Sequence, residues 1–242
     1  MPTIHSHGAT LYYEAHGNGF PILTFAPMGL QSTIDVWRHA SAPVNPITEF
    51  AARYQVIAMD QRNAGGRSHA PITADDGWDT YTADHVAVLD HLGIERCHLF
   101  GQCIGGPFIL NLIKHHPERV ASAVIAQPIG RVAPELPTRT ERFNLWASER
   151  SDHPEATEAV LDAFYRNLYA EGFAYAVDRD FVSRCQVPAL VLAGNDAAHP
   201  YAIAEEIARL LPNAEFIAEW KDGAALEAAR ARMHGFLDAH TP

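Results

Sequence analysis

The sequence has little positive charge and no long apolar run. Its 242 residues include 18 Lys and Arg against 29 Asp and Glu, which gives a formal net charge of −11. Nucleic acids and anionic membranes bind clustered basic side chains, so we expect neither as a partner. Apolar stretches such as PALVLAG (188–194) are too short to span a bilayer, and the opening MPTIHSHGAT lacks the basic and apolar regions of a signal peptide.

Cysteine is also scarce. The chain holds three cysteines, an odd number that does not indicate a disulfide framework, and we therefore expect a cytoplasmic, reducing location. No Cys-x-x-Cys or His–Cys cluster indicates a metal, and neither a P-loop nor a Gly-x-Gly-x-x-Gly motif indicates a nucleotide. The sequence thus predicts no metal and no cofactor, with a small-molecule substrate as the partner. It leaves a homodimer open.

Short apolar runs alternate with amphipathic stretches along most of the chain. The runs are rich in Val, Ile, Leu and Phe without strict alternation, as strands buried on both faces are. After a hairpin over 3–19, strands are expected at 22–26, 54–60, 97–101, 120–127, 188–194 and 214–219. Helices are expected near 35–51, 79–92, 104–116, 200–211 and 223–239. This order predicts one α/β domain over residues 1–242, with a mostly parallel sheet and helices on both faces.

The interval 132–184 breaks this alternation, because it has no strand pattern and is rich in Phe, Trp and Tyr. A structureless loop of that length is uncommon in a compact domain. We predict a small helical insertion that forms a lid over the strand ends. The alternative for each aromatic side chain is simple packing of the insertion on the core.

The motif GQCIGG (residues 101–106) lies between a predicted strand and a predicted helix. A nucleophile elbow needs this context, since the turn strains the backbone of the nucleophile and small neighbours let strand and helix approach closely. Cys103 stands at the nucleophile position. A thiol at a helix N-terminus can be acylated without a base, whereas hydrolysis of the resulting thioester still needs one.

These features together resemble the α/β-hydrolase superfamily over nearly the full length of the chain. The segment MDQRNAGGRSHAP (59–71) is similar to the family's D-x-R-G-x-G-x-S segment, with Asp60 and Arg62 in place and Asn63 where glycine is usual. The dienelactone-hydrolase branch of the superfamily carries cysteine at the nucleophile position. The resemblance therefore implies that Cys103 is an active nucleophile.

The resemblance also implies an acidic triad member and an oxyanion hole. The stretch LVLAGNDAAHP (190–200) resembles the end of the next-to-last strand, which gives the acidic role to Asp196. The oxyanion hole would combine the backbone N–H of Ile104 with one from the loop FAPMGLQSTIDVW. In that loop the donor is Met28 or Leu30, depending on the register.

The histidine that the superfamily carries after the last strand is absent. The corresponding stretch EFIAEWKDG (215–223) contains no histidine. His199, three residues after Asp196 and at the start of a predicted helix, is a candidate for the base. Further candidates are His39, His69 and His234.

We therefore predict an α/β-hydrolase-fold enzyme that hydrolyses a small ester, lactone or thioester with Cys103 as the nucleophile. Acyl transfer and carbon–carbon bond chemistry at the same site stay open. A non-catalytic, ligand-binding role also stays open, because several members of this superfamily lack activity and the histidine is missing here. Rapid alkylation of Cys103 would favour the enzyme, and slow alkylation the binding protein.

Overall fold

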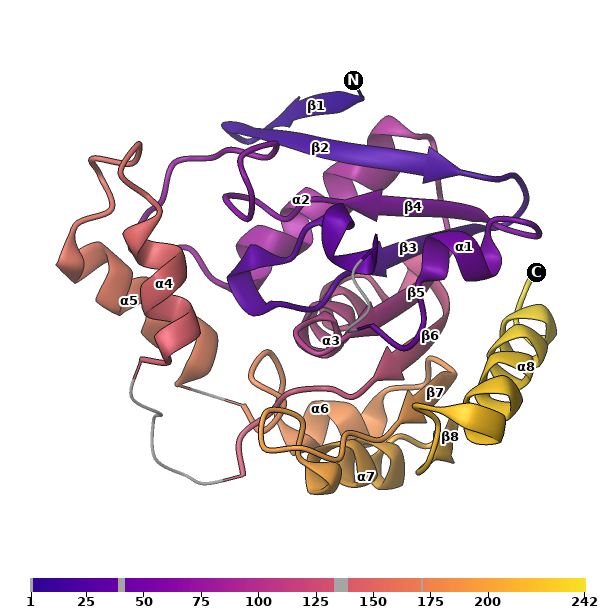
Figure 1. Cartoon of the computed structure of the whole chain (residues 1–242). Coiled ribbons are helices and arrows are strands. Elements are labelled where there is room, and N and C mark those ends of the chain that lie inside the picture. The colour runs from indigo at the N-terminus through magenta and orange to yellow at the C-terminus, as the bar shows by residue number, and fades with distance from the viewer. Residues whose placement is uncertain (1, 39–41, 133–138, 171) are drawn as a thin grey trace.

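The computed structural model of the chain describes residues 2–38, 42–132, 139–170 and 172–242. In these residues eight strands form one sheet in the order β1-β2-β4-β3-β5-β6-β7-β8 (Figure 1). The strands are β1 Thr3–Ser6, β2 Ala9–His16, β3 Pro21–Phe25, β4 Gln55–Met59, β5 Cys97–Gln102, β6 Val120–Ala126, β7 Ala189–Leu192 and β8 Ala214–Ile217. β2 pairs antiparallel with β1 and β4, and the other neighbours are parallel. The predicted mostly parallel sheet is confirmed.

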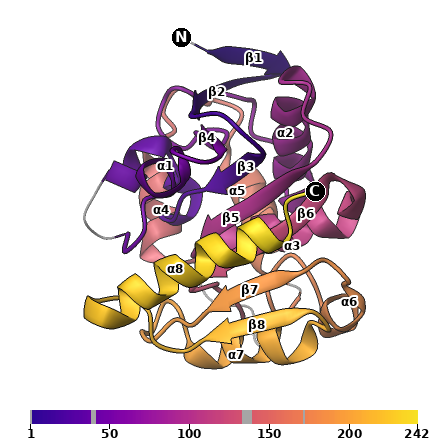
Figure 2. The same cartoon turned by 90° about the vertical axis from the view of Figure 1, so that its right-hand side faces the viewer.

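Helices cover both faces of this sheet. They are α1 Pro46–Phe50, α2 Trp78–His91, α3 Gly105–His115, α4 Glu141–Ser148, α5 Glu158–Tyr169, α6 Arg179–Arg184, α7 Tyr201–Leu210 and α8 Gly223–Ala239. In β5, Leu99 faces the core formed with α2, α3 and α7, whereas Phe100 faces the core formed with α1 and α8. Figure 2 shows α8 lying across the strands on its face. Burial on both faces explains why the strand sequences are continuously apolar.

The helix predicted near 35–51 is shorter than expected. A 3₁₀ turn covers Ile34–Arg38, and a regular helix forms only at α1, while residues 39–41 lie outside the described part. Asn45 begins α1 by accepting the backbone N–H of Ile47 at 3.0 Å, and Pro46 occupies the first helical position. Proline cannot continue a helix from its N-terminal side, so the amphipathic pattern is interrupted there.

The loop after β4 folds around two acid–base pairs. Arg62 donates two hydrogen bonds of 2.7 Å to Asp84 of α2, and both side chains are buried. Asp60 accepts two hydrogen bonds from Arg67, at 2.5 and 2.8 Å, and a third from the backbone N–H of Ile34 at 2.8 Å. These contacts join the loop to α2 on one side and to the loop after β3 on the other.

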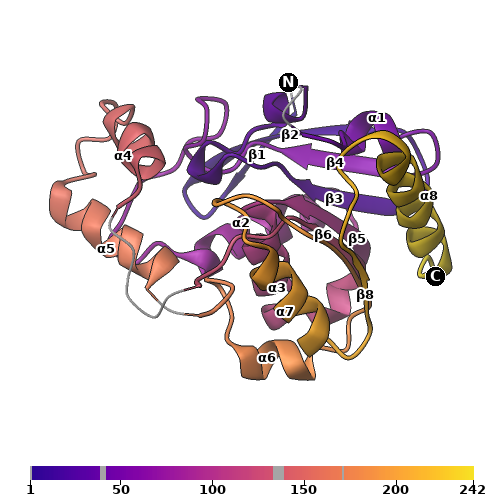
Figure 3. The ribbon, with the colours of Figure 1, turned by 60° about the horizontal axis from the view of Figure 1, so that its bottom comes forward.

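Two helices, α4 and α5, stand apart from the other helices, at the carboxyl ends of the parallel strands (Figures 1 and 3). The hydroxyls of Thr140 and Thr157 cap their N-termini. Phe143 and Trp146 of α4 contact the ring of Phe164 in α5, with centroids 6.2 and 5.6 Å apart. The two helices therefore pack as a pair through their aromatic side chains, in a unit that we call the α4–α5 pair.

The predicted insertion at 132–184 contains helices and no strand among its described residues, and its residues 133–138 and 171 lie outside them. The third helix of the insertion, α6, packs beside α7 rather than with the α4–α5 pair (Figure 3). The described residues contain no helix that is long and apolar enough to cross a membrane. A lid function for the insertion stays a prediction.

Replacing Arg62 with Leu should lower the free energy of unfolding by about 3–5 kcal/mol, because the carboxylate of Asp84 would stay buried without its partner. Urea unfolding measures this loss. The control is Arg53→Leu, which breaks an exposed pair with Asp238 (2.8 Å) and should cost less than about 1 kcal/mol. Equal losses in the two variants would contradict the importance of the buried pair.

Candidate active site

Cys103 occupies a sharp turn between β5 and α3. Its φ is +60°, in the left-handed region that non-glycine residues rarely adopt. The backbone N–H of Cys103 donates to Ala126 of β6 at 3.0 Å, which fixes the turn to the sheet. A β-carbon on Gly101 would lie 2.7 Å from the carbonyl oxygen of Gly105, and one on Gly105 would lie 2.8 Å from that of Phe25. Both glycines are therefore needed for the close packing of strand, turn and helix.

Asp196 and His199 form a hydrogen-bonded pair in the turn between β7 and α7. The Nδ1 of His199 lies 2.8 Å from Oδ1 and 3.0 Å from Oδ2 of Asp196. Oδ1 also accepts the backbone N–H groups of Ala198 at 3.0 Å and His199 at 2.9 Å. A carboxylate can only accept here, so Nδ1 carries the proton and Nε2 keeps its lone pair. This is the histidine orientation that a catalytic acid usually imposes on a base.

Gly194 makes this turn possible. A β-carbon at Gly194 would lie 2.1 Å from the carbonyl oxygen of His199 and 2.6 Å from its β-carbon. Any side chain at this position would push His199 away from the end of β7. The glycine at the strand end thus determines where the imidazole lies.

The imidazole of His199 lies near enough to Cys103 for the thiol to affect its pKa. Nε2 is buried and makes no hydrogen bond of normal geometry among the described residues. Burial lowers the pKa of His199, but the Cys103 thiol, followed by Asp196, outweighs burial and raises it above its ordinary value. Catalytic hydrogen bonds are often loose until substrate binds. The structure therefore places Cys103 near a histidine that Asp196 holds by hydrogen bonds.

The position after β8, where the superfamily's histidine is expected, is filled by Trp220 and Lys221. Trp220 is buried and its Nε1 donates to the carbonyl oxygen of Ala193 at 2.7 Å. The Nζ of Lys221 lies 3.7 Å from Oδ2 of Asp196. Burial raises the pKa of Asp196, but the hydrogen bonds from His199, together with the charge of Lys221, hold it below the usual range. This segment therefore supports the acid instead of supplying the base.

A cavity of about 530 Å³ opens over Cys103, within the size range of small-molecule sites. We call it the Cys103 cavity. Met28, Cys103 and His199 line it from the sheet side, and the α4–α5 pair and the segment that follows contribute Thr140, Arg142, Tyr165, Tyr169 and Tyr175. Burial raises the pKa of Tyr169 and of Tyr175, so both phenols stay protonated at neutral pH and can donate hydrogen bonds.

Backbone strain is concentrated around this cavity. Met28 (φ +90°), Cys103 (+60°), Gln127 (+38°) and Tyr175 (+55°) all line it, and each is a non-glycine residue with positive φ. Such conformations cost about 1–3 kcal/mol each and persist where surrounding structure holds them. Their gathering at one cavity is typical of a functional site.

The two backbone positions considered for the second oxyanion donor differ in their surroundings. Met28 lines the Cys103 cavity, whereas Leu30 is buried in the core. The backbone N–H of Ile104, at the first turn of α3, has no acceptor among the described hydrogen bonds. Of the two residues, Met28 is therefore the one at the wall of the cavity.

The remaining candidate histidines lie elsewhere. His39 falls outside the described residues. His234 lies 3.0 Å from the carboxylate of Glu49, and His69 lies beside Asp152, 3.8 Å away. Neither lines the Cys103 cavity as the structure describes it.

The sequence did not predict the polar cavity residues Gln127 and Arg142. Gln127 follows β6, and its place at the same sheet edge as Cys103 could have been inferred from the strand order. Arg142 reaches the cavity from the first turn of α4, and no motif marks it.

Three comparisons show which known proteins the chain resembles in sequence and fold. Residues 28–150 match the model of a family described as alpha/beta hydrolase fold. The "Putative carbamate hydrolase RutD" of Azorhizobium caulinodans is 31% identical over 254 residues, covering 93% of this chain and 91% of that protein. The enol-lactonase from Burkholderia xenovorans LB400 has a TM-score of 0.69 at 22% identity, covering 98% of this chain and 100% of that one. Est816, described as an N-acyl homoserine lactone degrading enzyme, has a TM-score of 0.70 at 24% identity over 97% of this chain and 100% of its own.

Replacing Asp196 with Asn should lower the pKa of His199, because the carboxylate that favours the imidazolium is lost. A proton NMR titration of the histidine C2 protons measures this, with the signal assigned by its loss in His199→Gln. Asp79→Asn is the control, since Asp79 pairs with the exposed His115 at 3.0 Å, and it should leave the His199 signal unchanged. A His199 titration unaffected by Asp196→Asn would contradict the pairing.

Proposed function

Because the chain belongs to the α/β-hydrolase fold family, we propose that it hydrolyses a small ester, lactone, thioester or carbamate through an acyl intermediate on Cys103. The observation that supports the proposal is that Cys103 and His199 line the wall of one cavity and that Asp196 holds His199 by hydrogen bonds. The relative named as a carbamate hydrolase covers nearly the whole chain and supports this class of carbonyl substrate.

In the first half of the reaction, the sulfur of Cys103 attacks the carbonyl carbon and Nε2 of His199 takes up the thiol proton. The N–H groups of Ile104 and Met28 hold the negative oxygen that forms. When the tetrahedral intermediate collapses, the leaving alcohol, thiol or amine receives the proton from His199. Asp196 keeps Nδ1 protonated throughout and stabilises the imidazolium.

In the second half, water attacks the carbonyl carbon of the acyl-Cys103 thioester while Nε2 of His199 takes up a proton from the water. The carbon–sulfur bond then breaks, the acid product leaves, and His199 returns the proton to the sulfur of Cys103. The sequence offers several candidate histidines for this base and does not choose among them. His199, in the turn after β7, is proposed as this base because it lines the same cavity as Cys103. The triad is therefore atypical in the origin of its histidine and in its nucleophile.

The substrate pocket combines one cation with neutral hydrogen-bond donors. Arg142 and the hydroxyls of Tyr169 and Tyr175 line the side contributed by the α4–α5 pair and the segment after it. We propose that the α4–α5 pair is the lid and that these groups orient a polar substituent of the substrate. The three free cysteines agree with a cytoplasmic location, which stays a prediction, as does a homodimer.

A rapid-mixing experiment with p-nitrophenyl acetate tests the proposed function. The wild type should release a burst of p-nitrophenol followed by steady turnover, and mass spectrometry should find one acetyl group on Cys103. Cys103→Ala should lose both phases. His199→Ala should reduce steady turnover by about 10²–10⁴-fold, because water then lacks its base.

His115→Ala is the matched control, since His115 is also a histidine paired with an aspartate but lies away from the cavity. It should retain the wild-type burst and turnover. Unchanged turnover in Cys103→Ala would refute the thiol nucleophile. An acyl adduct that is discharged by an added alcohol and not by water would indicate acyl transfer, and the absence of any adduct would indicate a binding protein.

A further inference from the structure

We propose that His69, Asp152 and His153 form a binding site for a divalent transition-metal cation such as Zn²⁺, separate from the Cys103 cavity. We call these three residues the His69 site. One ligand atom from each lies within 4.8 Å of the other two. Nothing in the catalytic proposal uses them.

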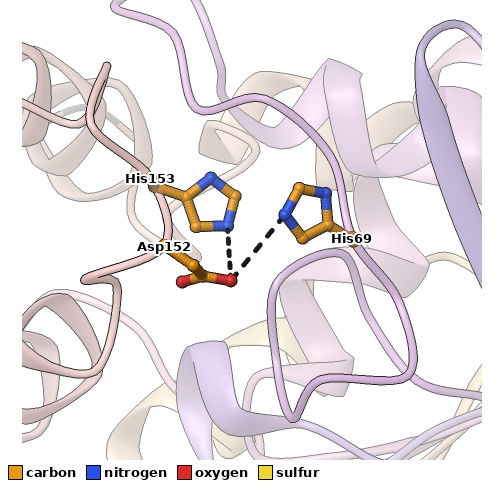
Figure 4. A group of neighbouring side chains, drawn as sticks. All are labelled: His69, Asp152 and His153. Atoms are coloured by element: carbon orange, nitrogen blue, oxygen red, sulfur yellow. Dashed lines mark ion pairs between the residues drawn. The ribbon is translucent and has the colours of Figure 1, made fainter.

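The geometry of the His69 site suits a shared cation better than direct hydrogen bonds. The Nε2 atoms of His69 and His153 point at the same carboxylate oxygen, Oδ2 of Asp152, from 3.8 and 3.9 Å (Figure 4). Both distances are too long for a hydrogen bond. Ligands around a tetrahedral zinc with bonds of about 2.0–2.2 Å stand roughly 3.4 Å apart, so a small inward shift would close the three atoms on one ion.

A second carboxylate holds His153 in the form that binds metals. The Nδ1 of His153 lies 2.8 Å from Oε1 of Glu155, and the same oxygen accepts the backbone N–H of Ile72 at 3.1 Å. Because the carboxylate can only accept, Nδ1 carries the proton and the lone pair of Nε2 faces Asp152. Metal-binding histidines almost always have such a partner on the opposite nitrogen. His153 is also buried, so its ring is fixed before any ion arrives.

Ring stacking aligns the second histidine with the first. The rings of His69 and His153 are 4.5 Å apart and 18° from parallel. Figure 4 shows both rings presenting a nitrogen to the same side, where Asp152 lies. Two imidazole nitrogens and one carboxylate oxygen are ligands that zinc and its neighbours prefer, whereas calcium and magnesium prefer all-oxygen sites.

The His69 site joins two parts of the fold. His69 is fixed to the sheet, since it exchanges backbone hydrogen bonds of 2.7 and 2.8 Å with Thr10 of β2. Asp152 and His153 lie in the connection between α4 and α5. A cation bound here would connect the α4–α5 pair to the sheet and raise the thermal stability of the protein. The sequence analysis predicted no metal, because His69 lies more than eighty residues before Asp152 and His153 and the three form no motif.

Isothermal titration with ZnCl₂ tests the proposal on tag-free, EDTA-treated protein. The titration is run on the wild type and on Cys103→Ser, because the Cys103–His199 pair could itself take up zinc. In the Cys103→Ser background we expect one zinc per chain, a raised melting temperature, and no response to MgCl₂ or CaCl₂. Adding His69→Ala should weaken zinc binding at least tenfold and remove the rise in melting temperature.

His115→Ala in the same background is the control, since His115 also faces an aspartate, Asp79, at 3.0 Å but has no third ligand among the residues that the structure describes. It should bind zinc as its parent does. His69→Gln and Asp152→Asn provide second variants if His69→Ala does not fold in EDTA. The proposal is overturned if the parent binds no zinc, or if the His69 and Asp152 variants bind it as tightly as His115→Ala.

Discussion

The close approach of Gly194 to His199 is the constraint on which the site depends. With a hydrogen in place of a side chain at Gly194, the chain folds back directly after β7, and Asp196 caps the turn by accepting two of its backbone N–H groups. The acid and the imidazole therefore come from one short segment at one strand end. Their mutual position does not depend on how the last strand or the last helix is placed.

Because the imidazole comes from the turn after β7, the segment after β8 does not have to supply one and has a structural role instead. Trp220 is buried there and hydrogen-bonds to Ala193, the residue just before Gly194. The indole thus fixes the end of β7 from which the turn starts, and Lys221 adds a positive charge beside Asp196. A residue of indole size leaves no room for an imidazole at the same place. Trp220 therefore occupies the place where the superfamily's histidine would otherwise lie.

The sequence predicted those features that depend on local patterns. Continuously apolar runs identified the parallel strands, because burial on both faces removes polar residues from them. The turn at Cys103 was predictable since its glycines are neighbours in the chain. The prediction of a helix over 35–51 is wrong in its extent, because Pro46 begins α1 and apolar periodicity does not register that interruption. The choice between Met28 and Leu30 could not be made, since it depends on which one the folded loop turns toward the cavity.

Contacts between distant segments were beyond the reach of sequence patterns, and Asn63 shows why they matter. Its φ of +57° is one that glycine adopts freely and asparagine tolerates better than most residues. Its side chain also accepts the backbone N–H of Ala70 at 2.9 Å, which glycine could not do. In this conformation its carbonyl oxygen accepts hydrogen bonds from Trp146 and Arg150, at the end of α4. Asn63 in place of glycine therefore stabilises the loop after β4 and connects its backbone to the α4–α5 pair, which contributes to the wall of the Cys103 cavity.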